Sequence, residues 1–194
     1  MFGQWHKAMR TAVVALVIAL VLVVIFLHYL PRADVAKPIP PQPAGIPSVV
    51  GPAGPEYAYP IRDLTPGAID TAVTQNNIQS TICVPGYTRA IRPPERFTSR
   101  LKSQIGAAYG LDGDLWDYEL DHFIPLELGG CPDCVSNLWP EPYQTSIPDG
   151  GARTKDKVEN YFHDQVCAGA IPLAEAQREI AYDWYRVYVN SVKH

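Results

Sequence analysis

The chain has 194 residues, 47% of them hydrophobic, and a formal net charge of −4. This length leaves room for one ordinary domain rather than several, and no internal repeat is apparent. The acidic balance is not that of a uniformly basic nucleic-acid-binding protein, so any phosphate-binding surface has to be local.

An apolar run near the N-terminus takes a large share of the hydrophobic residues. Residues 12–27 are sixteen consecutive apolar residues, and Lys7 and Arg10 precede them. A helix of about 20 residues, rising 1.5 Å per residue, crosses a bilayer core. A cleaved signal peptide is the alternative, since it too has a basic region before its apolar core.

The sequence after the run favours an anchor over a signal peptide. A cut at Ala36 would place Asp34 at the −3 position, where a small residue is needed. We therefore predict a short tail over residues 1–11 and a transmembrane anchor over residues 12–30. The N-terminus is expected in the cytoplasm and the rest of the chain outside it; cleavage would make the protein secreted.

A proline-rich segment follows the apolar run. Ten prolines fall between Pro31 and Pro66, a stretch of 36 residues, so neither a helix nor a sheet can propagate through it. We predict an extended linker over residues 31–64 that holds a domain of residues 65–194 away from the membrane. A proline-rich ligand for another protein is the alternative for this linker.

The domain itself predicts helices around a two-stranded hairpin. Thr65 and Pro66 form a helix-start signal, with Thr65 as a cap. Later segments predict a helix over 95–110, a strand over 118–128, a second strand over 135–143, a helix over 154–167 capped by Thr154, and a final amphipathic helix over 172–192. The fold class is therefore α+β with a small antiparallel hairpin.

A polar pair interrupts the first strand. Asp121 and His122 stand side by side in YELDHFIPLELGG, although neighbouring side chains of a strand point to opposite faces. Hairpin pairing can bring Asn137, at the start of the second strand, to His122. A helix packed across the hairpin can add Glu159 and His163, which are four residues apart and share a helix face.

The order of these motifs resembles a known nuclease family. The segments TICVPGYTRAIRPPERFT, YELDHFIPLELGG, NLWPEPY and KDKVENYFHDQVCAG are similar to the HNH, or His-Me finger, endonucleases, within a group of bacterial HNH-like proteins. The resemblance covers about residues 79–184. It implies a ββα-metal core, a hairpin plus a helix, with flanking helices.

The resemblance also implies roles for individual residues. His122 would be the general base that takes a proton from the attacking water, and Asn137 would fix the hairpin and orient His122. Asp121 would hold a single divalent metal ion, Mg²⁺ or similar. For the remaining ligand His163 is the first choice, before Glu159 and then Asn160, and the choice stays open because PEPYQTSIPDGGART separates the second strand from the helix.

A basic stretch precedes the hairpin. The segment 88–102 carries five cationic side chains against Glu95 alone, namely Arg89, Arg92, Arg96, Arg100 and Lys102. In an acidic chain this clustering suggests a local surface for DNA or RNA, although an ordinary solvated face is the simpler interpretation. Lys155 and Lys157 are further candidates for phosphate contacts. No segment resembles a base-reading helix, so we expect little sequence specificity.

The four cysteines allow two interpretations. Cys131 and Cys134 form a C-x₂-C pair, which with Cys83 and Cys167 could make a structural zinc site, as in some HNH relatives. Outside the cytoplasm, disulfides Cys83–Cys167 and Cys131–Cys134 are favoured instead, because the isolated cysteines do not supply a second C-x₂-C pair.

Two functions follow from this sequence. The first is a membrane-tethered, metal-dependent endonuclease of low sequence specificity that hydrolyses phosphodiester bonds of DNA or RNA. The second is a non-catalytic module on a membrane stalk that binds nucleic acid or envelope components and keeps the HNH frame as a scaffold.

Overall fold

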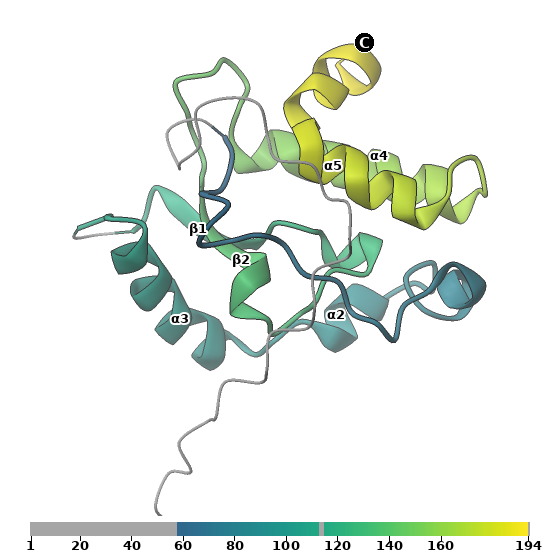
Figure 1. Ribbon diagram of the computed structural model, residues 1–194, viewed down its shortest axis with the longest axis horizontal. Helices are drawn as coiled ribbons and strands as arrows, with labels where there is room; N and C mark the ends of the chain where they lie inside the picture. The colour runs from purple at the N-terminus through teal and green to yellow at the C-terminus, as the bar shows by residue number, and fades with distance from the viewer. Residues whose placement is uncertain (1–57, 113–114, 194) are drawn as a thin grey trace, which may run out of the picture. The chain divides into compact units, whose positions relative to one another are not determined.

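The computed structural model describes residues 58–112 and 115–193 (Figure 1). Among them, no helix is long and apolar enough to cross a membrane. The expected anchor and most of the expected linker lie outside the described residues. The helices and strands are α2 (Tyr87–Ile91), α3 (Glu95–Ala108), β1 (Tyr118–His122), β2 (Leu138–Pro142), α4 (Ala152–Cys167) and α5 (Leu173–Val187).

The two strands form an antiparallel hairpin, β1 with β2. The register pairs Leu120 with Pro140 and His122 with Leu138. The two prolines of β2 alternate with Trp139 and Glu141. Proline has no N–H, and both prolines fall on the edge of the strand that faces away from β1, where the ladder needs no donor. Proline is therefore compatible with this short strand.

Strand β1 ends earlier than the sequence pattern predicts. The strand stops at His122, and Leu126–Leu128 turns into a short 3₁₀ helix that buries both leucines. Pro125 precedes this turn and has no N–H to offer a continuing ladder. The polar pair Asp121 and His122 thus stands at the end of the strand.

Helix α3 covers one side of the hairpin. Ile105 and Tyr109, at the end of the helix, belong to a buried cluster with Phe123, Leu138 and Trp139. Pro94 precedes the first helical residue, and Gly110 follows the helix with a φ of 73°. A glycine adopts this left-handed conformation without steric cost, so the helix ends where the sequence predicts.

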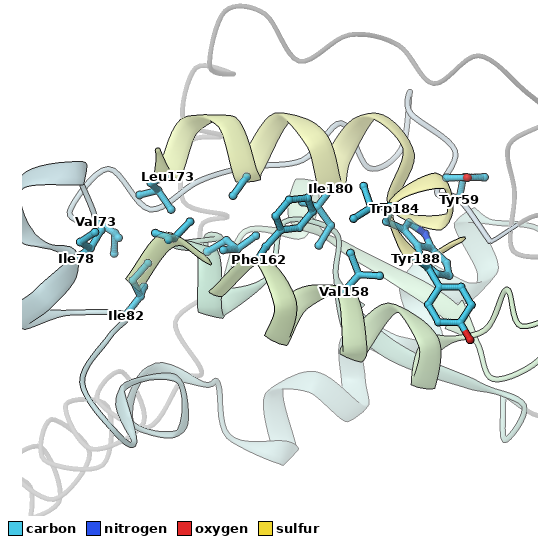
Figure 2. Packing of buried hydrophobic residues seen from close by; sticks show 14 of the residues in the cluster. Tyr59, Val73, Ile78, Ile82, Val158, Phe162, Leu173, Ile180, Trp184 and Tyr188 are labelled. Carbon is cyan, nitrogen blue, oxygen red and sulfur yellow. The ribbon is translucent and has the colours of Figure 1, made fainter. Parts of the chain in front are cut away.

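A second and larger cluster lies between α4 and α5, which pack side by side (Figure 2). Helix α4 contributes Val158, Phe162 and Val166, spaced four residues apart on one face. Ile180 and Trp184 of α5 face them and are almost fully buried. Fully burying one such side chain contributes about 1.5–3 kcal/mol, so this pair of helices is the main apolar core.

The packed part of the chain begins before the predicted boundary at residue 65. Ala58 and Tyr59 are buried against Trp184, whose indole Nε1 donates to the Ala58 carbonyl at 2.8 Å. No helix begins at Thr65. Its hydroxyl instead donates to the Leu138 carbonyl at 2.9 Å and accepts from Tyr109 at 2.7 Å, so Thr65 ties the entering chain to β2 and α3.

Two disulfides pair the four cysteines as the disulfide interpretation expects. Cys83 is bonded to Cys167, at the end of α4, and Cys131 is bonded to Cys134. The first bond joins residues 84 positions apart, whereas the second closes a loop three positions long. The first therefore restricts the unfolded chain far more than the second.

Removing the long-range disulfide should cost more stability than removing the local one. For Cys83→Ser with Cys167→Ser, chain entropy predicts that the free energy of unfolding falls by about 4–5 kcal/mol. For Cys131→Ser with Cys134→Ser, the same relation predicts about 2 kcal/mol. Denaturant unfolding of the two double variants measures both losses, and equal losses would contradict this account of the Cys83–Cys167 bond.

Candidate functional site

The end of β1 directs its two polar residues to different partners. The carboxylate of Asp121 reaches Lys155 on α4, and the imidazole of His122 reaches the loop that carries Pro132. This is the divergence that a strand imposes on neighbouring side chains. His122 is 3% exposed and the side chain of Asp121 is 15% exposed, so neither belongs to a solvated face.

A backbone carbonyl fixes the protonation of His122. Its Nε2 lies 2.9 Å from the carbonyl oxygen of Pro132. Because a carbonyl only accepts hydrogen bonds, Nε2 carries the proton, and in the neutral ring Nδ1 keeps a free lone pair. Burial lowers the pKa of His122, and this outweighs the opposing effect of the Asp121 charge. The imidazole is therefore neutral near pH 7, with Nδ1 as a base.

Asn137 holds the connection between the two strands. Its Oδ1 accepts from the backbone N–H of Ile124 at 2.9 Å and of Ala68 at 3.2 Å. Its Nδ2 donates to the carbonyls of Ile124 at 2.9 Å and Cys131 at 3.1 Å. The side chain is completely buried, and these four bonds use all of its donors and both oxygen lone pairs.

The structure gives Asn137 an indirect connection to His122. The amide holds the Cys131 carbonyl, and the next residue, Pro132, supplies the carbonyl that accepts from His122. Asn137 therefore fixes the loop that orients the histidine. It also pins β1 against β2, because it bonds both backbone groups of Ile124, just beyond the strand.

A buried lysine joins α4 to the hairpin. Lys155 is 1% exposed, and its Nζ lies 2.6 Å from Asp121 Oδ2 and 3.5 Å from Glu141 Oε2. It also contacts Glu159 one turn along α4 and donates to the His122 carbonyl at 3.1 Å. We call Asp121, Glu141, Lys155 and Glu159 the carboxylate–lysine cluster. It joins β1, β2 and α4 at one point.

The carboxylate–lysine cluster contains more acid than base. Burial opposes the charge on Lys155, but the surrounding carboxylates outweigh it and raise its pKa. Burial likewise opposes the charge on Asp121, yet the ammonium of Lys155 holds the pKa of that carboxyl well below its usual range. The ammonium is therefore paired chiefly with Asp121.

The two glutamates of the cluster behave differently. Burial raises the pKa of Glu141 well above its usual value, and burial raises that of Glu159 to about 8, in both cases against the pull of Lys155. One ammonium cannot balance three carboxylates, so both glutamates are shifted toward their protonated forms.

His163 lies at the other end of α4 from Lys155, beside the Cys83–Cys167 disulfide. Its Nε2 is 2.9 Å from the carbonyl of Ile82 and 3.4 Å from Cys167 Sγ. The structure does not bring His163 to Asp121, whereas it does bring Glu159 there. Asn160, the third candidate ligand, is exposed, and its amide donates to the Asp156 carbonyl of the same helix at 2.7 Å.

The residues predicted to contact phosphate differ in exposure, since most lie on the surface and Lys155 is buried. Arg89, Arg92, Arg96 and Arg100 are exposed on α2, α3 and the connection between them, and Lys102 is partly exposed. Burial has the largest effect on the pKa of His122, and the positive charge of Arg92 makes a smaller contribution that also lowers it. Arg92 therefore influences the candidate site. Lys157 is exposed near Tyr188, but Lys155 is inside the cluster and faces no solvent.

Sequence reasoning missed Glu141, Pro132 and the role of Lys155. The spacing of Lys155 and Glu159, four residues apart, is a signal for their ion pair. Nothing local marks Glu141, because its role depends on how α4 packs on the hairpin. Pro132 acts through its backbone carbonyl, and any residue offers that group.

Hard and soft metal donors occur in separate places. Two groups of described residues converge closely enough to hold an ion, Cys83 with His163 and Cys167, and Cys131 with Asp133 and Cys134. The cysteines of both groups are bonded to one another as disulfides. The carboxylate–lysine cluster offers oxygen donors, which Mg²⁺, Mn²⁺ and Ca²⁺ prefer.

Comparisons with known proteins give no relative for this chain. No protein-family model matches it, and no curated protein or solved structure matches it. The resemblance to HNH endonucleases thus stays an interpretation of the motifs.

Truncating Asn137 should strongly destabilise the fold. Asn137→Ala leaves four buried backbone groups without this partner, and one unsatisfied buried group costs about 1–3 kcal/mol. We expect the free energy of unfolding to fall by about 3 kcal/mol or more. Asn160→Ala is the control and should change it by less than about 0.5 kcal/mol. Similar losses in both variants would contradict the bracing role.

Lys155→Met should destabilise the fold, and a divalent cation should restore part of the lost stability. Leaving buried carboxylates unpaired costs about 3–5 kcal/mol. The loss should be larger at pH 8 than at pH 5.5, because the charge of Lys155 lowers the pKa of Glu141 and of Glu159. Without Lys155 both folded-state pKa values rise further, so more stability is lost where the glutamates must ionise. Thermal unfolding at both pH values measures this difference.

Divalent metal provides the second half of that test. At pH 8, Mn²⁺ should raise the melting temperature of Lys155→Met in a concentration-dependent way, because it binds the folded state. Lys157→Met removes a lysine from the exposed face of the same helix and should show neither the loss nor the metal response. A Lys155→Met protein insensitive to Mn²⁺ would show that the three carboxylates do not form a cation site.

Proposed function

We propose that this chain is a metal-dependent endonuclease that hydrolyses phosphodiester bonds of DNA or RNA with low sequence specificity. The observation that carries the proposal is the state of His122. Its imidazole is neutral, its Nε2 proton is committed to the Pro132 carbonyl, and its neighbour Asp121 enters a cluster of three carboxylates. A fixed base beside an acidic cluster suits attack by water on a phosphodiester.

The oxygen donors of the cluster are of the type that a hard divalent cation prefers, but Asp121, Glu141 and Glu159 are not among the described groups that converge on one point, so a cation would have to draw them together. Asp121, Glu141 and Glu159 supply oxygen ligands, and the raised pKa values of the two glutamates show acidic groups that lack a full complement of cations. Lys155 already stands among these carboxylates, so a metal ion and the ammonium compete for them. Asp121 and Glu159 are the ligands that we assign, because both side chains are partly exposed.

The protein groups have distinct roles in this proposal. Nδ1 of His122 takes a proton from the water as the water oxygen bonds to phosphorus. The ester P–O bond to the leaving sugar oxygen breaks, and that oxygen takes a proton from solvent. The Pro132 carbonyl keeps the neutral ring in the required tautomer and holds the ring in place after Nδ1 is protonated. Arg92 is exposed and its charge lowers the pKa of His122, so it is the side chain that we assign to hold a phosphate of the substrate. A bound divalent ion supplies positive charge that stabilises the phosphorane-like transition state.

Two features support an extracytoplasmic site of action. The described domain contains two disulfides, which persist in oxidising compartments. The apolar run over residues 12–27 favours delivery across or into a membrane. We propose a single-pass protein with its nuclease domain outside the cytoplasm.

A non-catalytic binding module is the second candidate, and specific observations favour it. His122 is only 3% exposed, and Lys155 gives the carboxylates an internal cation. In such a module the exposed arginines of α2 and α3 would bind nucleic acid or an envelope component without cleavage. The two candidate functions both predict binding of nucleic acid, but only the endonuclease predicts its cleavage.

The deciding experiment compares cleavage by two histidine variants of the full chain. Plasmid DNA and RNA are incubated with the protein in Mg²⁺ or Mn²⁺, and EDTA should abolish cleavage. His122→Ala should lower the rate by about 10²–10⁴, the usual effect of losing a positioned base. His163→Ala should keep most of the activity, because His163 contacts the disulfide and not the cluster.

Each result discriminates between hypotheses. Turnover like wild type by folded His122→Ala would reject the assignment of the base, and loss of activity in His163→Ala would restore His163 as a ligand. Binding of DNA or RNA without cleavage in any metal would favour the non-catalytic module.

A further inference from the structure

The Cys131–Cys134 disulfide lies around the group that orients His122. Pro132 is inside the four-residue loop that this bond closes, and its carbonyl accepts the proton of Nε2 at 2.9 Å. The position of this carbonyl decides which ring nitrogen is protonated. Anything that fixes the loop therefore also fixes the lone pair of Nδ1.

Backbone bonds anchor both ends of this loop but not its middle. The N–H of Cys131 donates to the Ala68 carbonyl at 2.9 Å, and the Cys131 carbonyl accepts from Asn137. At the other end, the N–H of Asn137 donates to the Cys134 carbonyl at 2.9 Å. Between these anchors, Pro132 has no N–H of its own and Asp133 is exposed. The disulfide is the covalent constraint on that middle part.

We propose that the Cys131–Cys134 disulfide is a positioning element for His122, so that the base is set for reaction only in the oxidised protein. This inference rests on the proposed function and adds a form of regulation to the same site. It gives the local disulfide a role that its small effect on chain entropy does not explain.

Reduction is the step that would release the base. A dithiol such as dithiothreitol supplies two electrons and two protons, the Cys131–Cys134 bond breaks to two thiols, and the dithiol becomes a cyclic disulfide. Cys134 is partly exposed whereas Cys131 is buried, so the attack begins at the sulfur of Cys134. Re-oxidation reverses the step.

The other disulfide offers a matched control of the same chemistry. His163 also donates from Nε2 to a backbone carbonyl, that of Ile82, which precedes Cys83 in the chain. Each disulfide thus neighbours one carbonyl that orients one histidine. Removing one bond should disturb its own histidine and leave the other unchanged.

The first test measures cleavage by the two double variants of the full chain. Cys131→Ser with Cys134→Ser should lower kcat by about 10- to 100-fold with little change in KM, because misplacing a reacting group by about 1 Å has effects of this size. Cys83→Ser with Cys167→Ser should keep its kcat at a temperature where circular dichroism shows it folded. In this second variant the Cys131–Cys134 bond is the one left to reduce, and dithiothreitol should lower kcat reversibly.

The second test does not depend on activity. In ¹⁵N-histidine-labelled protein at pH 8 without metal, long-range ¹H–¹⁵N spectra report the tautomer of each ring. His122 should show the Nε2–H form in wild type and a mixture of tautomers in Cys131→Ser with Cys134→Ser, whereas His163 keeps its form. The His122→Ala spectrum assigns the signal.

The outcomes separate this proposal from the nuclease proposal. If oxidised wild-type protein cleaves nothing, the nuclease proposal fails, and the tautomer spectrum alone decides whether the disulfide positions His122. An unchanged His122 tautomer in a folded Cys131→Ser, Cys134→Ser protein overturns the positioning role. So does an unchanged kcat in an active protein.

Discussion

The buried amide of Asn137 is the constraint on which the site depends. It joins the segment around Ala68, the end of β1 at Ile124 and the loop at Cys131, three parts of the chain that share no regular ladder. The loop conformation around the end of β1 leaves backbone groups facing inward, and a buried backbone group needs a partner. A side chain with two donors and two acceptors meets this need in the smallest volume. A hydrophobic residue at position 137 could fill the space but not hold the loop.

The carboxylate–lysine cluster solves a different problem, the attachment of α4 to the hairpin. An apolar contact would attach the helix without fixing its rotation, whereas Lys155 reaches both strands and so sets which face of α4 points inward. Burying charge in this way contributes little net stability, because desolvation offsets the Coulombic attraction. The surplus of carboxylates over cations also goes beyond what an ion pair needs. That surplus is the physical reason for the proposal that the cluster binds a cation.

Local sequence patterns predict the long helices, whereas long-range contacts determine the structure at positions such as Thr65. Pro94 and Gly110 bracket α3, which occurs close to its predicted limits. Pro172 precedes α5, which begins as predicted but ends at Val187, before a π-helical turn over Tyr188–Val192. Helix α4 begins at Ala152, so the predicted cap at Thr154 is wrong. Thr65 carries a helix-start signal, yet its hydroxyl is used by Leu138 and Tyr109 and no helix forms. Propensity yields to tertiary contacts at such a position.

The candidate site shows the same division. Asp121, His122 and Asn137 could be selected from the sequence, because a polar pair inside a strand and an asparagine at the next strand both need an explanation. The choice between Glu159 and His163 could not be made in this way. Both lie on one face of α4, one turn apart, and only the packing of the helix shows which turn meets the carboxylate–lysine cluster.

The adjacency of Asp121 and His122 follows from the need to serve two sides of one strand. In the proposed mechanism, the base must face the loop that fixes its proton, and the carboxylate must face the helix that brings the other charged groups. Consecutive strand residues point to opposite faces, so a two-residue motif at the end of β1 meets both needs. A slip of one residue in the register would exchange the two side chains, placing a carboxylate against the Pro132 carbonyl and an imidazole against Lys155. Asn137 prevents this slip by bonding both backbone groups of Ile124 just beyond the strand. The residue that braces the loop therefore also decides which of the two polar side chains becomes the base.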